Sequence, residues 1–375
     1  MAFYDIMYIQ MREILNTILQ GDCITRMRAM PDASVDAVFC DPPYMLQLGA
    51  KTLYRPEDQT EARAVRDAWD SFESGAEYEK FTRDYLAECM RVLKPTGAMW
   101  VIGSYHNIYK IGQIMQEMGF WILNDILWVK TNPMPNFRGT RFTNAHETLI
   151  WATPVKTGKY TFNYDTLKKY NGGKQMRSDW HIDICLGAER IKGADGKSLH
   201  STQKPAELLR RVILSSTRAG DVILDPFFGT GTTGAVAREL SRNFIGIEMD
   251  ENYINAARAR IENVTPVDLS EIEVPAKREE IKIAFRELIE ARLLYVGQTL
   301  VGARGDRVMI TKDAQLAHTT LGKASIHVMA AKIQNAAAFN GWDYWRAEKK
   351  DGTLVSIDEV RKYARKLKEG MKKAA

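Results

Sequence analysis

The feature that most constrains the fold is the alternation of short apolar segments with segments of helical periodicity between residues 34 and 263. Strands are predicted at 34–40, 98–103, 121–129, 146–152, 221–225 and 243–248, and helices at 78–92, 108–118 and 205–217, with two more ending near 240 and 263. Strands that alternate with helices favour a mostly parallel sheet covered on both faces. We therefore predict an α/β fold.

Length and composition indicate how the chain is organised into domains. A Pro- and acid-containing stretch at 265–275 is predicted to be a linker, and 276–375 a separate small domain. The first twenty residues lack the features of a secretory signal, and no apolar run is long enough to span a bilayer. The four cysteines are scattered without a C-x-x-C pair, which is typical of reduced thiols in a cytoplasmic protein.

Charge is unevenly distributed. Residues 130–211 hold 15 Lys and Arg against 7 Asp and Glu, a net of +8, and residues 266–375 hold 20 against 15, a net of +5. Two basic regions that flank a more acidic one suit a polyanionic partner, although solvated lysines would give the same pattern.

A glycine-rich segment, D-P-F-F-G-T-G-T-T-G (225–234), follows one predicted strand and enters a helix. Gly229, Gly231 and Gly234 match the G-x-G-x-x-G dinucleotide pattern, and Glu248 ends the next strand, where it could hold ribose hydroxyls. A tight turn without a ligand is the structural alternative. The pattern predicts an adenosine-bearing cofactor, which leaves a nicotinamide-dependent dehydrogenase open.

A second motif, D-P-P-Y (Asp41, Pro42, Pro43 and Tyr44), ends another buried strand. An exocyclic amine of a base is a weak nucleophile, and it becomes reactive when a carboxylate and a backbone carbonyl accept its hydrogens. Asp41 and the Pro42 carbonyl can be these acceptors, the prolines restrict the backbone, and Tyr44 offers a face for base stacking. A strand-end turn capped by Asp is the structural alternative, and a dehydrogenase would leave this motif unexplained.

Together, D-P-P-Y and F-F-G-T-G (227–231) resemble the amino-methyltransferases that use S-adenosyl-L-methionine, in the motif order of their beta group. The chain is most similar to the cell-cycle-regulated (CcrM-type) DNA adenine-N6 methyltransferases of bacteria. The likeness begins near Gly21 and includes the segments 103–109, 132–142, 144–152, 202–205 and 340–345. The first twenty residues fit less well, so 1–20 is predicted to be an N-terminal extension and the natural start could lie later.

This resemblance implies a methyltransferase domain at 21–264, a Rossmann-like sheet in permuted order and a C-terminal domain that assists DNA binding. It also implies that Asp22 meets the adenine of the cofactor, Glu248 its ribose, and Thr202 and Lys204 its methionine carboxylate. Phe227, Gly229, Gly231 and Thr232 would line the cofactor, with Asp225 beneath the loop. Asp rather than Ser at position 41 favours adenine N6 over cytosine N4.

The basic region 130–201 is predicted to be the DNA-recognition insert. Its candidate DNA contacts are Lys130, Asn136, Arg138, Arg141, Asn144 and His146, since Arg can bind guanine bidentately; solvation or capping is the alternative for each. His181 and Cys185 stand four apart without further ligands, so no metal site is predicted. Trp342, Tyr344 and Trp345 are expected in the core of the last domain.

We therefore expect a site-specific adenine-N6 methyltransferase that acts by base flipping on duplex DNA, and the resemblance to the cell-cycle-regulated enzymes implies GANTC as its target sequence. The resemblance implies a homodimer on DNA and a cytoplasmic, nucleoid-associated bacterial protein. A cytosine-N4 enzyme of the same fold, the dehydrogenase and a DNA-binding regulator with a vestigial site are the alternatives.

Overall fold

The computed structural model describes residues 11–45, 53–54, 61–62, 70–136, 139–156, 159–193, 196–274, 282–349 and 352–374. The chain divides into two compact units, Met1–Pro275 and Ala276–Ala375. Each unit has its own hydrophobic core.

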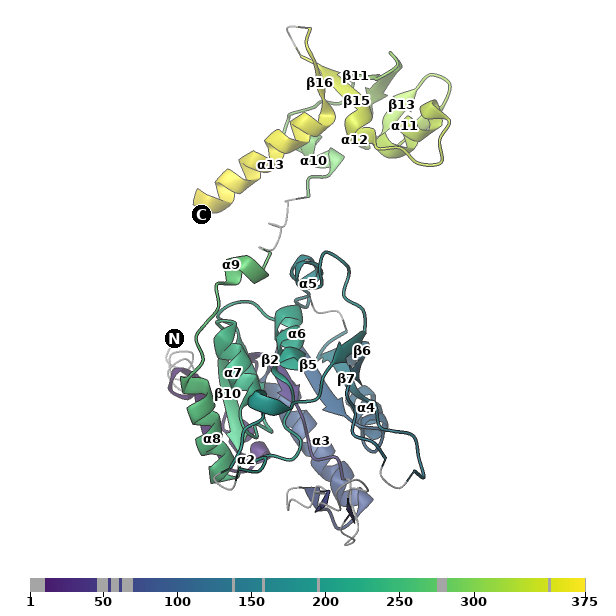
Figure 1. Cartoon of the computed structure of the whole chain (residues 1–375). Coiled ribbons are helices and arrows are strands. Elements are labelled where there is room, and N and C mark those ends of the chain that lie inside the picture. Colours follow the sequence, from purple (N-terminus) through teal and green to yellow (C-terminus); the bar gives the residue numbers. More distant parts are fainter. Residues whose placement is uncertain are drawn as a thin grey trace. The chain divides into compact units, whose positions relative to one another are not determined.

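The first unit is built on an eight-stranded sheet with the strand order β1-β10-β9-β2-β5-β7-β6-β8 (Figure 1). The five strands from β1 to β5 in this order run parallel, β7 is antiparallel to both of its neighbours, and β8 is parallel to β6. The strands are β1 (Thr17–Gln20), β2 (Val35–Cys40), β5 (Leu93–Gly103), β6 (Trp121–Lys130), β7 (His146–Thr153), β8 (Asp179–Ile182), β9 (Val222–Asp225) and β10 (Asn243–Glu248). A separate short ribbon pairs β3 (Leu53–Tyr54) with β4 (Glu61–Ala62).

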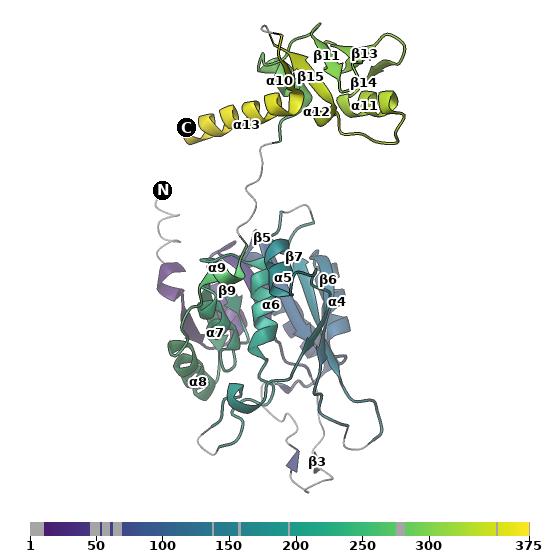
Figure 2. The same cartoon turned by 45° about the horizontal axis from the view of Figure 1, so that its top comes forward.

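Helices cover both faces of this sheet. One face packs against α2 (Cys23–Arg28), α3 (Gly75–Val92) and α4 (Ile108–Glu117). The other packs against α5 (Tyr164–Tyr170), α6 (Ala206–Ser216), α7 (Thr232–Glu239) and α8 (Glu251–Glu262), of which α6 and α7 lie on the near side in Figure 2.

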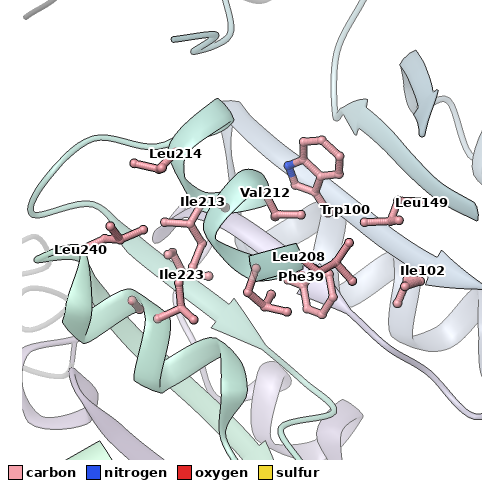
Figure 3. Packing of buried hydrophobic residues seen from close by; sticks show 14 of the residues in the cluster. Phe39, Trp100, Ile102, Leu149, Leu208, Val212, Ile213, Leu214, Ile223 and Leu240 are labelled. Atoms are coloured by element: carbon pink, nitrogen blue, oxygen red, sulfur yellow. The ribbon is translucent and has the colours of Figure 1, made fainter. Parts of the chain in front are cut away.

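Alternation along the strands explains why both faces are buried. Phe39 and Trp100 face the cluster formed with α6, where Leu208 and Val212 meet them (Figure 3). The neighbouring residue Val38 faces the opposite cluster, formed with α2, α3 and α4. Because successive side chains point to opposite faces, a strand covered on both sides must be apolar throughout. The predicted α/β class is confirmed, and the half of the sheet that comes second in the chain lies beside the first, since β9 pairs with β2.

The structure differs from the predicted boundaries at three places. β1 lies inside the stretch predicted as an extension, and it pairs with β10 from Thr17 opposite Ile245 onward. The predicted linker 265–275 contains α9 (Leu269–Ile272), which packs within the first unit: Leu269 and Ile272 contact its core, and Glu273 pairs with buried Arg242 at 2.5 Å. Within the predicted insert 130–201, the structure adds a strand that was not predicted, β8, beside the predicted strand β7, and this region also holds the short 3-10 turn η2 (Gly187–Glu189).

The second unit is an antiparallel sheet with the order β14-β13-β12-β11-β15-β16. Its elements are α10 (Phe285–Glu290), β11 (Thr299–Gly302), β12 (Arg307–Ile310), β13 (Leu316–His318), β14 (Gly322–Ala324), α11 (Ile326–Gln334), α12 (Gly341–Tyr344), β15 (Trp345–Glu348), β16 (Leu354–Ser356) and α13 (Ile357–Ala374). Trp342, Tyr344 and Trp345 are buried in its core, as predicted.

Candidate active site

The two predicted motifs leave the sheet side by side. β2 and β9 are adjacent parallel strands, with Val38 opposite Leu224, so the segments after them emerge at the same edge. Asp41 directly follows β2, and Asp225 is the last residue of β9. The following helices, α3 and α7, pack on opposite faces. Such a switch point, outside the carboxyl ends of the strands, is where open α/β sheets bind ligands.

A cavity of about 550 Å³ lies at this edge. Its size suits a ligand of the dimensions of a nucleoside cofactor. The predicted residues among its walls are Asp22, Asp41, Pro42, Pro43, Tyr44, Thr202, Lys204, Asp225, Phe227, Gly229, Thr232 and Glu248. The cavity therefore brings together the D-P-P-Y motif and nearly all the predicted cofactor residues.

Asp41 uses its two carboxylate oxygens differently. Oδ2 lies 2.8 Å from the Lys204 ammonium. Oδ1 is buried and has no hydrogen-bond partner within the described part of the chain. Burial raises the pKa of Asp41, while the charge of Lys204 opposes that rise. A buried carboxylate oxygen without a donor is costly, so this atom is suited to accept a hydrogen bond from a ligand.

The rest of the D-P-P-Y motif is held rigidly. The Pro43 carbonyl accepts hydrogen bonds from the Tyr78 hydroxyl at 2.9 Å and from Asn107 Nδ2 at 3.5 Å. The Tyr44 hydroxyl donates to Glu147 Oε2 at 2.9 Å. The backbone and the aromatic ring after Asp41 are thus fixed by α3, by the residue that precedes α4, and by β7.

Gly229 and Gly231 of the glycine loop share a backbone conformation but differ in their surroundings. Gly229 (φ +50°) and Gly231 (φ +75°) both adopt left-handed backbone conformations. A Cβ at Gly231 would lie 2.7 Å from the Cβ of Ala257 in α8. Gly231 therefore permits the packing of α7 against α8, and it is not among the walls of the cavity, whereas Gly229 is.

Two acids brace this loop. Asp225 accepts hydrogen bonds from the Phe227 amide at 2.9 Å and from the Thr233 hydroxyl at 2.5 Å, and burial raises its pKa to about 7. Glu248 accepts from the backbone amides of Gly229, Met249 and the following residue at 2.8–2.9 Å. Burial nevertheless raises the pKa of Glu248. Asp225 thus lies beneath the loop, as the resemblance implied.

The remaining cofactor candidates sit around the same cavity. Asp22 caps α2 by accepting from the Thr25 amide at 2.8 Å. Thr232 starts α7, and its hydroxyl donates to the Lys204 carbonyl at 3.3 Å. The Lys204 ammonium contacts Asp41, so its predicted contact with a methionine carboxylate stays a prediction.

The comparison with known protein families identifies the family of the chain. The DNA methylase family (N6_N4_Mtase) matches residues 35–259, which contain both motifs. The chain belongs to this family. Membership decides against the dehydrogenase.

Known proteins that are similar to this methylase support the family assignment. The Type II methyltransferase M.HinfI of Haemophilus influenzae is 47% identical over 354 residues, covering 93% of this chain and 96% of that protein. The Type II methyltransferase M2.MboI of Moraxella bovis is 38% identical over 262 residues, covering 70% and 93%. The solved PvuII DNA methyltransferase (cytosine-N4-specific) shares the fold at a TM-score of 0.51 and 21% identity, covering 66% of this chain and 87% of that one.

Two charged residues of the methylase site were not predicted to act there. Glu147 was not singled out, and Lys130 was predicted to contact DNA. The Lys130 ammonium lies 2.8 Å from Glu147 Oε1, and each side chain is only 11% exposed. This burial argues against a phosphate contact for Lys130. Burial favours a raised pKa for Glu147, but Lys204 and Lys130 lower it below its ordinary value. One signal in the sequence could have found Glu147. This acid alternates along one strand with the core residues Leu149 and Trp151, so its side chain is expected on the same buried face, where a charge needs a partner.

Of the other DNA candidates, Asn136, Arg141 and Asn144 lie on the connection between β6 and β7, and His146 is the first residue of β7. Because β6 runs parallel to β5 and β2, this connection starts at the sheet edge that holds the cavity. Arg141, Asn144 and His146 are exposed, and Asn136 is partly buried. Arg141 Nη1 donates to the Tyr105 hydroxyl at 3.2 Å. Arg138 lies outside the described residues.

No group of three or more His, Cys, Asp or Glu side chains in the described ranges of the methylase could hold a metal ion. None of the described helices is long and apolar enough to cross a membrane.

Proposed function

We propose that this chain is a site-specific DNA adenine-N6 methyltransferase that uses S-adenosyl-L-methionine and acts on duplex DNA at GANTC. The observation that carries the proposal is the environment of Asp41. One of its oxygens is held by Lys204, and the other is buried without a partner among the described residues, at the wall shared with the glycine loop. Asp rather than Ser at this position supports adenine as the target base.

The geometry suits the activation of an amine. The adenine amine carries two hydrogens, and its lone pair is delocalised into the ring. Asp41 Oδ1 accepts one hydrogen and the Pro42 carbonyl the other, which favours the pyramidal nitrogen that can be methylated. The Pro43 carbonyl is already held by Tyr78 and Asn107, so the acceptors are fixed before the substrate binds.

The cofactor residues fit S-adenosyl-L-methionine, which supplies an electrophilic methyl group on a sulfonium. Asp22 and Glu248 lie in the cavity for the adenosine part, and Phe227, Gly229 and Thr232 contribute the loop wall. When bound, the cofactor would give up its methyl group by cleavage of the S–C bond and leave as a neutral thioether, and the amine nitrogen that gains the methyl group would lose a proton. Because burial raises the pKa of Asp41, its carboxylate accepts that proton more readily than an ordinary aspartate does.

The target adenine has to leave the duplex to reach this cavity. Base flipping costs a few kcal/mol. Stacking on an aromatic side chain returns about 1–3 kcal/mol per base, and the Tyr44 ring, with its hydroxyl held by Glu147, is placed for that contact.

DNA recognition is proposed for the 131–145 connection with its exposed Arg141, for Arg138, and for the C-terminal unit. GANTC and a homodimer on DNA follow from the resemblance to the cell-cycle-regulated enzymes. Arg138→Ala with Arg141→Ala should reduce the slope of log Kd against log salt, because that slope counts neutralised phosphates. An unchanged slope would place the phosphate contacts elsewhere, and light scattering of the complex tests the dimer.

The activity test uses labelled S-adenosyl-L-methionine with duplexes that contain or lack GANTC, followed by digestion to nucleosides. Label in N6-methyladenine from GANTC duplexes alone is the expected result. Label in N4-methylcytosine would support the cytosine alternative, and no label would support the vestigial regulator. Asp41→Ala, which removes both carboxylate oxygens, should abolish transfer with cofactor affinity changed less than about threefold. Asp125→Ala, at an exposed position of β6, should leave transfer unchanged.

A further inference from the structure

Four charged side chains of alternating sign form a row of close contacts beside the proposed methylation site. Lys130 pairs with Glu147 at 2.8 Å, Glu147 lies 3.7 Å from Lys204, and Lys204 pairs with Asp41 at 2.8 Å. Their side chains are between 7% and 17% exposed. The row joins the end of β6, the start of β7, the residues before α6 and the segment after β2.

Stability alone does not explain this row. Removing charges from water is costly, and well-packed apolar side chains often serve a buried position at least as well as an ion pair. Only Asp41, at one end of the row, is proposed to touch the target amine, and of the other three only Lys204 has a predicted ligand, the cofactor. Lys130 and Glu147 therefore need a reason of their own.

Glu147 contacts two groups that matter to the substrate. Its Oε1 holds Lys130, while its Oε2 accepts from the Tyr44 hydroxyl at 2.9 Å and faces the Lys204 ammonium. That ammonium also lies 5.1 Å from the centre of the Tyr44 ring. One carboxylate therefore fixes the stacking platform and the cation that holds Asp41.

We propose that Glu147 is a positioning residue for methyl transfer, holding Lys204 against Asp41 Oδ2 so that Oδ1 alone faces the amine. The inference rests on the proposed function and adds a residue to its machinery. Without the charge of Glu147, Lys204 has only Asp41 as a counterion in this row, and the direction of the acceptor oxygen is no longer fixed.

The competing explanation is that Glu147 serves only as the counterion of buried Lys130. Two variants separate the explanations. Glu147→Gln keeps the shape and an oxygen that can accept from Tyr44, but it removes the charge and leaves Lys130 buried without its partner. Lys130→Met combined with Glu147→Gln removes both charges and so relieves that destabilisation.

The measurements are the thermal midpoint and the single-turnover rate with saturating cofactor and DNA. We expect Glu147→Gln to lower both, the rate by at least about thirtyfold. In the double variant the midpoint should return to within about 2 °C of the wild type, while the rate stays at least about tenfold low. Fluorescence of 2-aminopurine at the target position should still report extrusion, because the contact with Tyr44 is kept.

A double variant that regains both stability and rate would overturn the proposal, as would an unchanged rate in Glu147→Gln. Glu239→Gln is the matched control, and it should leave the rate unchanged. It removes the charge of a partly buried ion pair with Arg210 of α6, and Glu239 is the last residue of α7, whose first residue, Thr232, lines the cavity. A wild-type protein that transfers no methyl to adenine would instead contradict the proposed function, so the two failures are distinguishable.

Discussion

Replacing Asp225 with asparagine should remove a large part of the pH dependence of folding of the first unit. In the folded protein, burial raises the pKa of Asp225 from 3.8 to about 7, although the Thr233 hydroxyl and the Phe227 amide donate to it. In the unfolded chain the carboxyl is solvated. The stability that this group contributes is therefore fully present below about pH 4 and is lost as the pH rises toward about 7.

The magnitude follows from the two pKa values. A shift of about three pKa units corresponds to about 4 kcal/mol over the whole range, of which about 2.5 kcal/mol falls between pH 5 and pH 8. Asparagine keeps an oxygen for the Phe227 amide and an amide group opposite the Thr233 hydroxyl, and it does not ionise. The variant should therefore lack this contribution without losing the loop.

The assay is urea unfolding of the full chain, wild type and Asp225→Asn in parallel, at pH 5 and pH 8. The free energy of unfolding of the wild type should fall by about 2.5 kcal/mol more than that of the variant. Other titrating groups cancel in this difference because they are common to both proteins. Asp125→Asn, at an exposed position, should behave like the wild type. If the free energy of unfolding changed equally in the wild type and in Asp225→Asn between pH 5 and pH 8, the raised pKa assigned to buried Asp225 would be refuted.

Three further substitutions test other contacts. Gly231→Ala should cost about 3 kcal/mol in unfolding free energy, because strain and a clash with α8 combine, whereas Gly173→Ala, also at positive φ but in open space, should cost about 1 kcal/mol. Arg242→Met should cost about 3 kcal/mol, because the buried carbonyls of Leu240 and Thr217 lose their donor and Glu273 loses its partner. It should also speed proteolysis between 265 and 274, and unchanged proteolysis would show that other contacts hold α9. Tyr78→Phe should slow single-turnover transfer about tenfold while costing only about 1 kcal/mol of stability, because one hydrogen bond to the D-P-P-Y backbone is lost; an unchanged rate would show that this anchor is dispensable.

The elements that were predicted correctly depend on local periodicity. β2, β10 and α3 follow from runs of apolar residues and from helical spacing within a few turns of chain. β1 was missed because an edge strand of four partly exposed residues has little apolar signal of its own. The packing of α9 was missed because its partners, the core of the first unit and Arg242, are distant in sequence and give no local pattern.

For the site, too, local motifs could be read from the sequence, whereas contacts between distant residues could not. Asp41 and the glycine loop could be predicted because each motif carries its chemistry within a few consecutive residues. Lys204 was assigned to the cofactor from resemblance, which stays a prediction, and its ion pair with Asp41 was not predicted. Lys130 was assigned to DNA from its charge, which does not reveal that a carboxylate lies 2.8 Å away in a buried setting.

The sequence by itself therefore determined the α/β class, the two motifs and the base-directed chemistry that they imply, because periodicity and backbone restriction are properties of adjacent residues. Only the tertiary structure decided that β2 and β9 are neighbours, which makes two motifs nearly 200 residues apart one site. It also decided which charges meet at the floor of that site. Pairing between distant residues depends on strand order and burial, and a linear pattern of residues does not contain either.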